Sequence, residues 1–264
     1  MIHMSYNNFL TRMKAGGTTA RLEQIENGRR LLENSFADDP SYLADGCPVW
    51  YSDRVIYPRI YGHAFKTTLP NTAEIQTLID DPFYVGDIIP WGEDNGYWMV
   101  TSSKNLHNIN WEGTLEECNS YLKFKSKLDG SIREYPIPIY NATQYGSGEN
   151  SEYVSVSRQR QRMVTIGAEA HIFYLPIDEH TVLLDNGSRF LLDLNKYLPT
   201  AYRLTQIDTT TNNTNAKGGM LRIYVLEDQL NRKTDDVDNM VADMWEDPVG
   251  NNSEVHEETN TSWI

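Results

Sequence analysis

Two apolar runs separated by a short polar stretch form the clearest pattern in this chain. Residues 87–91 and 97–101 are rich in strand-forming side chains, and Asn95-Gly96 between them offers the backbone conformations that a tight hairpin turn requires. A similar phrase follows, in which the runs 181–184 and 189–192 flank Asp185-Asn186-Gly187. The pattern therefore predicts two β-hairpins and, from their likeness, two related β units.

The rest of the chain alternates short strand-like segments with turns, apart from one helical segment. Apolar residues recur at helical spacing from residue 22 to residue 36, between a capping threonine at 18 or 19 and Asp39-Pro40, and predict a helix through Ala37. Residues 72–79 are expected to form one or two helical turns, and residues 112–125 fit a strand or a helix. Strands are expected at residues 50–60, 64–69, 106–111, 131–140, 153–167, 171–175, 181–184, 189–192, 201–207 and 220–226.

These elements predict a mainly β protein with two small β-barrel or sandwich units, an N-terminal helix and an extended acidic C-terminal tail. We expect an arm and helix over residues 1–46, a first β-barrel unit over 47–127, and a second β unit with long loops over 128–230. Residues 231–264 would form the tail, and the chain after Asp228 is expected to be disordered in isolation.

Charge is distributed unevenly along the 264 residues, whose net charge is −14. From Thr234 onward there are nine acidic residues and no Lys or Arg, whereas residues 1–36 carry five basic and three acidic residues. Such ends suit head-to-tail contacts between subunits, although two solvated ends explain the pattern equally well. The sequence shows neither a membrane-spanning run nor a secretion signal, so Cys47 and Cys118 are expected to be reduced thiols.

Candidate chemistry is sparse. The sequence contains no phosphate-binding loop, nucleophile elbow or Cys-x-x-Cys pair, and we expect neither an enzyme nor a bound cofactor. The best metal candidate combines His171 with Asp178, Glu179 and His180. On a strand, His171 would lie far from a hairpin tip at residues 178–180, so we expect no metal site. Six tryptophans and sixteen tyrosines suit interfaces, or equally the cores of two small barrels.

One basic feature stands out. Arg158, Arg160 and Arg162 alternate with other residues, so an extended backbone would project all three guanidinium groups from one face. That arrangement suits phosphate contacts along a nucleic-acid backbone without base reading. The alternative is that the three arginines pair with acidic neighbours or lie between subunits.

Several motifs, taken in order, resemble virion proteins of tailed bacteriophages of Gram-positive hosts that belong to the head–tail neck. The resemblance covers about residues 10–240 and rests on the order and spacing of its motifs. The motifs include Gly16-Gly-Thr-Thr, Asp38-Asp-Pro-Ser-Tyr42, Val55-Ile-Tyr-Pro-Arg-Ile-Tyr61, Gly86-Asp87, Trp98-Met-Val100, Glu134-Tyr135-Pro136, Tyr145-Gly-Ser-Gly148 and Glu227-Asp-Gln229.

The resemblance implies a head-closure (stopper) or connector protein located in the virion and assembled in the host cytoplasm. Such a protein forms a homo-oligomeric ring of six or twelve copies around the DNA channel, with the portal or adaptor on one side and the tail or the next neck protein on the other. Packaged DNA would pass through without sequence readout, and no membrane would be involved. The alternatives are a carbohydrate- or receptor-binding virion module and another tail ring protein. Candidate partner-binding residues are Arg21, Arg29, Arg30, Trp245 and Trp263.

Overall fold

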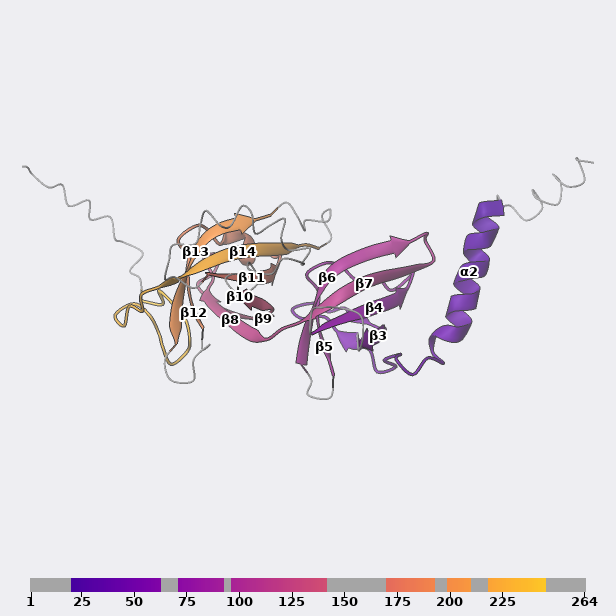
Figure 1. The fold of residues 1–264 in the computed structure, drawn as a ribbon, viewed down its shortest axis with the longest axis horizontal. Coiled ribbons are helices and arrows are strands. Elements are labelled where there is room, and N and C mark those ends of the chain that lie inside the picture. The colour runs from indigo at the N-terminus through magenta and orange to yellow at the C-terminus, as the bar shows by residue number, and fades with distance from the viewer. Residues whose placement is uncertain are drawn as a thin grey trace, which may run out of the picture.

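Within the residues that it describes, the computed structural model is a mainly β fold with one α-helix and two curled five-stranded antiparallel sheets, which confirms the predicted fold class (Figure 1). It describes residues 20–62, 71–92, 96–141, 170–192, 199–209 and 218–245. Helix α2 (Ala20–Phe36) lies at one end of the molecule, followed by the first sheet and then the second. No helix in these ranges is long and apolar enough to cross a membrane.

The first β unit is a five-stranded antiparallel sheet in the order β3-β4-β7-β6-β5. Its inward side chains, among them Ile75, Val100 and Leu115, pack with Phe83 into one core. A two-stranded sheet, β1–β2, adds Cys47 and Ile56 to that core. The strands are β1 (Cys47–Pro48), β2 (Val55–Ile56), β3 (Arg59–Gly62), β4 (Thr72–Leu78), β5 (Ile88–Trp91), β6 (Gly96–Leu106) and β7 (Asn110–Glu117).

The first predicted hairpin is present. Strand β5 pairs with β6 in the register Ile88↔Met99 and Ile89↔Trp98, and residues 93–95 of the connection lie outside the described chain. Residues 72–79, expected to be helical, instead form β4 over residues 72–78, between β3 and β7. Their side chains alternate between buried and exposed positions, and this strand periodicity prevails over the weak helical signal.

The second β unit combines a five-stranded sheet in the order β10-β11-β14-β13-β12 with the two-stranded sheet β8–β9. Phe124 and Tyr135 of the smaller sheet pack against Phe173, Phe190 and Tyr202 of the larger one. The change of core therefore falls just before β8, whereas the sequence analysis placed the change of unit at residue 128. The strands are β8 (Ser120–Lys125), β9 (Ile132–Ile137), β10 (Ile139–Asn141), β11 (Ala170–Pro176), β12 (Arg189–Leu192), β13 (Thr200–Asp208) and β14 (Met220–Asp228).

The prediction of the second hairpin, over residues 181–192, is wrong. Thr181–Leu183 forms a short 3-10 helix, η1, and β12 pairs with β13 rather than with the run before the Asp-Asn-Gly turn. Asp178 causes the difference, because its carboxylate accepts the backbone N–H groups of His180 and Thr181 and closes a turn where a strand was expected. Of the other expected strands, residues 64–69 and 153–167 lie outside the described ranges.

The two β units meet at a close backbone contact. A Cβ atom built on Gly86, whose φ is +91°, would lie 2.2 Å from the carbonyl oxygen of Gly219. Beside this point Met99 and Ile88 of the first unit pack with Ile172 of the second. No flexible linker separates the units: only two residues connect β7 to β8, and the side chain of one of them, Asn119, bonds both backbone groups of Ile139 at 2.8 and 3.0 Å.

Helix α2 confirms the predicted helical segment, and its apolar residues are unevenly buried. Phe36 is buried at its C-terminus, whereas Leu31 is 73% exposed. The buried guanidinium of Arg59 lies over the Phe36 ring and donates hydrogen bonds to the carbonyl oxygens of Ser35 and Phe36. Arg59 therefore caps the C-terminal end of the helix, where a positive charge is most favourable.

Candidate functional site

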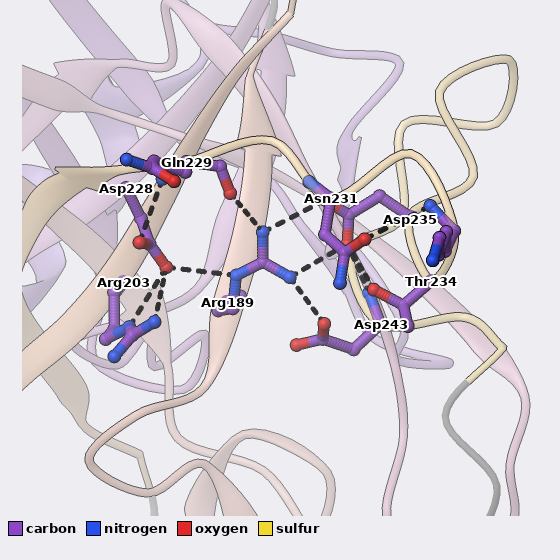
Figure 2. Close-up of polar contacts among 9 residues, drawn as sticks. Arg189, Arg203, Asp228, Gln229, Asn231, Thr234, Asp235 and Asp243 are labelled. Carbon is purple, nitrogen blue, oxygen red and sulfur yellow. Dashed lines mark hydrogen bonds and ion pairs between the residues drawn. The ribbon is translucent and has the colours of Figure 1, made fainter.

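The most concentrated polar site in the described chain surrounds Arg189, the first residue of β12 (Figure 2). Its Nε donates to Asp228 Oδ2 at 3.0 Å. Its Nη1 donates to Asp235 Oδ1 at 2.9 Å and to Asp243 Oδ1 at 2.5 Å. Its Nη2 donates to Asp235 Oδ2 at 3.0 Å and to the carbonyl oxygen of Gln229 at 2.7 Å. One guanidinium thus gathers three carboxylates from three points in the chain, and we call these four residues the Arg189 cluster.

Further hydrogen bonds reach two of these carboxylates, those of Asp228 and Asp235. Arg203 donates through Nε to Asp228 Oδ2 at 3.0 Å, and the backbone amide of Asn231 donates to Asp235 Oδ2 at 2.8 Å. The backbone amide of Asp243 donates to Asp235 Oδ1 at 3.0 Å. Asp235 has no exposed side-chain surface. A buried carboxylate is costly unless it is paired and hydrogen-bonded, and here it is both.

The electrostatics keep Arg189 and Asp235 ionised. Burial alone would lower the pKa of Arg189, but hydrogen bonds and attraction from Asp235 and Asp243 outweigh it and raise the pKa above its ordinary value. Burial would likewise raise the pKa of Asp235, but its bonds from Arg189 and the backbone amides prevail and lower it. Groups held permanently charged suit a structural clamp better than proton transfer.

The clamp fastens residues 229–245 onto the second β unit. Leu230, Met240 and Ala242 of this segment pack on Leu191 and Ala201 of β12 and β13. Asp236 and Val241 exchange backbone hydrogen bonds across a turn within the segment. The expectation that the chain after Asp228 is disordered in isolation is therefore wrong for these residues, because Arg189 pairs with Asp235 and Asp243 of the segment. Residues 246–264 lie outside the described part.

The pH dependence of stability gives a direct check on the Arg189 cluster. The pKa of Asp235 is below the ordinary 3.8, so the stability it contributes is complete above that pH and is lost as the pH falls through the lowered value. We expect Asp235→Asn to lower the free energy of unfolding most at about pH 6, and the difference from wild type to shrink towards about pH 2. Urea titrations across this range measure it.

Asp236→Asn is the matched control for that experiment. The pKa of Asp236 is also lowered, but by hydrogen bonds from Asn239 rather than by an arginine. Its side chain is less buried than that of Asp235. Its effect on stability at pH 6 should be well below that of Asp235→Asn. A pH-independent difference between wild type and Asp235→Asn would contradict the charge pairing.

A cleft of about 350 Å³ lies where the two β units meet. Tyr135 donates its hydroxyl proton to Asp178 Oδ2 at 2.5 Å, and His180 Nδ1 contacts the hydroxyl of Ser126 at 2.8 Å. Burial, then the neighbouring Asp178 carboxylate, raises the pKa of Tyr135, so its hydroxyl stays protonated. Asp178 and His180 of the cleft are thus engaged, whereas Trp50 Nε1 and Arg133 Nε, which also line it, are buried and have no hydrogen-bond partner among the described residues. His171 does not line the cleft. No group of three or more potential metal-binding side chains occurs within the described ranges.

The two thiols are poor nucleophiles. Burial, followed by repulsion from Asp81, raises the pKa of Cys47 to about 11. Burial, with Glu116 and Glu117 nearby, raises the pKa of Cys118 further. Since the thiolate is the reactive form, neither cysteine is activated for catalysis.

The predicted site residues that the structure describes do not come together. Arg158, Arg160, Arg162 and Trp263 lie outside the described chain. The other predictions fall at opposite ends of the molecule: Arg21 and Arg30 are exposed on α2, Arg29 donates to the carbonyl oxygen of Asn108 at 2.5 Å, and Trp245 is 62% exposed after the clamped segment. On α2 the three arginines are balanced by Glu23, Glu26 and Glu33, so the helix itself carries no net charge.

Trp91 and Trp98 bear on the alternative of a carbohydrate-binding module. Their rings pack edge to face at 4.8 Å, and Trp98 Nε1 donates to the carbonyl oxygen of Trp91 at 3.1 Å. Both pack against the core of the first unit. Their rings therefore serve the fold rather than forming an exposed platform on which a sugar could stack.

Comparison with known proteins yields little. No family model and no curated protein matches the chain. Among solved structures, K. pneumonia MrkH in its apo state is 11% identical with a TM-score of 0.24, over 81% of this chain and 87% of that chain. A second structure of MrkH, described as a c-di-GMP-dependent transcription regulatory factor, is 11% identical with a TM-score of 0.22, over 82% and 86%. Scores of this size establish no common fold.

Proposed function

We propose that this protein is a non-enzymatic structural component of a tailed-bacteriophage neck, a head-closure or head–tail connector protein that assembles as a ring around the DNA channel. The proposal starts from the motif resemblance and from the mainly β architecture. The observation that carries it is helix α2, which has the features of an element that packs on another subunit.

Helix α2 makes few contacts with the rest of the chain that the structure describes. Beyond the Arg59 cap at its C-terminus, it meets the turn between β6 and β7, where Gly28 approaches Ile109 and Arg29 bonds the carbonyl oxygen of Asn108. In Figure 1 the helix stands at the end of the molecule, beside this turn and away from both sheets. A helix of 17 residues is only marginally stable without tertiary packing, so its exposed side needs a partner.

Leu31 is the most exposed apolar residue of the helix, at 73% against 48% for Leu22, and it supplies the test. We expect Leu31→Glu to abolish ring assembly and incorporation into virions without changing the urea midpoint of the monomer, because the side chain is already in solvent. Native mass spectrometry of the protein mixed with portal, and mass spectrometry of purified virions, measure the two effects.

Val182→Glu is the matched control, since Val182 is 54% exposed on η1 in the second unit and the change adds the same charge. It should leave assembly intact. A wild-type protein that stays monomeric with portal and is absent from virions would refute the proposed function. Equal assembly of Leu31→Glu and wild type would refute the role of α2.

A further inference from the structure

The small sheet β8–β9 turns one face to the core and the other outward. Leu122 and Phe124 point inward, so the alternate residues of β8 lie on the opposite face. In the register of the hairpin, Lys123 lies across from Glu134 and Lys125 across from Ile132. The β8–β9 outer face comprises Tyr121, Lys123, Lys125, Ile132 and Glu134.

This outer face is apolar and basic, and much of it is uncovered. Tyr121 is 49% exposed and Ile132 is 43% exposed. Lys123 pairs with Glu134 at 3.4 Å, but Lys125 forms no ion pair within the part of the chain that the structure describes. Lys125 Nζ instead donates to the carbonyl oxygen of Met244 at 3.2 Å. A cation that lacks a carboxylate, flanked by exposed apolar side chains, fits an acidic and partly apolar segment.

The hydrogen bond to Met244 also places the end of the described chain beside this face. Trp245 is the last residue described, so residues 246–264 begin next to Lys125. These residues include five acidic side chains, no Lys or Arg, and apolar side chains such as Trp263 and Ile264. An extended chain advances roughly 3.3 Å per residue, so the segment is much longer than the six-residue strand β8.

We propose that residues 246–264 bind along the β8–β9 outer face of their own chain. The acidic side chains pair with Lys125, and apolar side chains of the segment cover Tyr121 and Ile132. The short tether from Met244 gives the segment a high effective concentration at this face, which favours its own chain over a second copy. The inference does not rest on the proposed ring function.

Hydrogen exchange read by mass spectrometry on the full-length protein tests this docking. We expect residues 246–264 to exchange more slowly than the same sequence as a free peptide, and Lys125→Glu to speed their exchange about three- to tenfold, as befits the loss of a surface ion pair and its replacement by repulsion. Raising the salt concentration on wild type should have the same direction of effect. The amides of Leu122 and Phe124 report whether the sheet itself stays folded.

Lys104→Glu is the matched control, because Lys104 is exposed on β6 in the other unit. It should leave the exchange of residues 246–264 unchanged. Carbodiimide cross-linking of mixed light and heavy-isotope protein then identifies the donor chain, and we expect Lys125 links to Glu246 or Asp247 within one isotope only. Mixed-isotope links, an unprotected segment in wild type, or protection that survives Lys125→Glu would each overturn the proposal.

Discussion

Arg189→Met should lower the free energy of unfolding by about 3 to 5 kcal/mol, the loss observed when one partner of a buried ion pair is removed. The substitution keeps a long side chain but leaves Asp228, Asp235 and Asp243 without their shared cation (Figure 2). Repulsion among these carboxylates should also release residues 229–245 from β12 and β13. Urea unfolding measures the first effect, and hydrogen exchange of residues 231–243 measures the second.

Arg203→Met provides the comparison, because Arg203 contacts the same Asp228 but has a side chain 57% exposed to solvent. A pair at that exposure contributes about 1 kcal/mol or less. If the two substitutions proved equally costly, the burial of the Arg189 cluster would not be the source of its stabilising effect.

Gly86→Ala is expected to be the other severe substitution, with a loss of about 3 to 4 kcal/mol in the free energy of unfolding. The residue has a φ of +91°, which disfavours any side chain, and the new Cβ would meet the backbone oxygen of Gly219. Because that atom belongs to the second unit, the clash must push the two β units apart. We expect a lower thermal midpoint and faster exchange of the Met99 amide.

Gly130→Ala separates the effect of the positive φ from the effect of the clash with the second unit. Gly130 also has a positive φ, +72°, but a Cβ there would meet no atom within 4 Å. Gly130→Ala should therefore lower the free energy of unfolding by only about 1 kcal/mol, the penalty for a side chain in the left-handed backbone conformation. Similar losses at the two positions would show that close approach between the units contributes nothing.

The sequence predicted local structure where one periodicity was strong. The β5–β6 hairpin and helix α2 fall near their expected ranges, because alternation and helical spacing act within a few residues. The fold class was also predictable. Strand β4 was misassigned because its polar side chains weaken the alternation that burial on one face requires.

The Arg189 cluster could not be predicted, because nothing in the spacing of its members indicates contact. Arg189 is separated from Asp243 by 54 residues, and a salt bridge of this kind depends on how β12, β14 and the following turns pack. The single available signal was the excess of carboxylates after Thr234, which called for a counter-charge without identifying it. Such pairing is a property of tertiary structure, as is the match of Gly86 with Gly219.

The direct passage from β7 to β8 has a mechanical consequence. Only two residues lie between the strands, and Asn119 is bonded to both backbone groups of Ile139. The connection therefore cannot lengthen unless these hydrogen bonds break. Tension applied along the chain would load hydrogen bonds in both sheets at once, and torsion of one sheet would turn the other. Under a pulling force the two β units should therefore unfold together, as one mechanical unit, rather than one after the other.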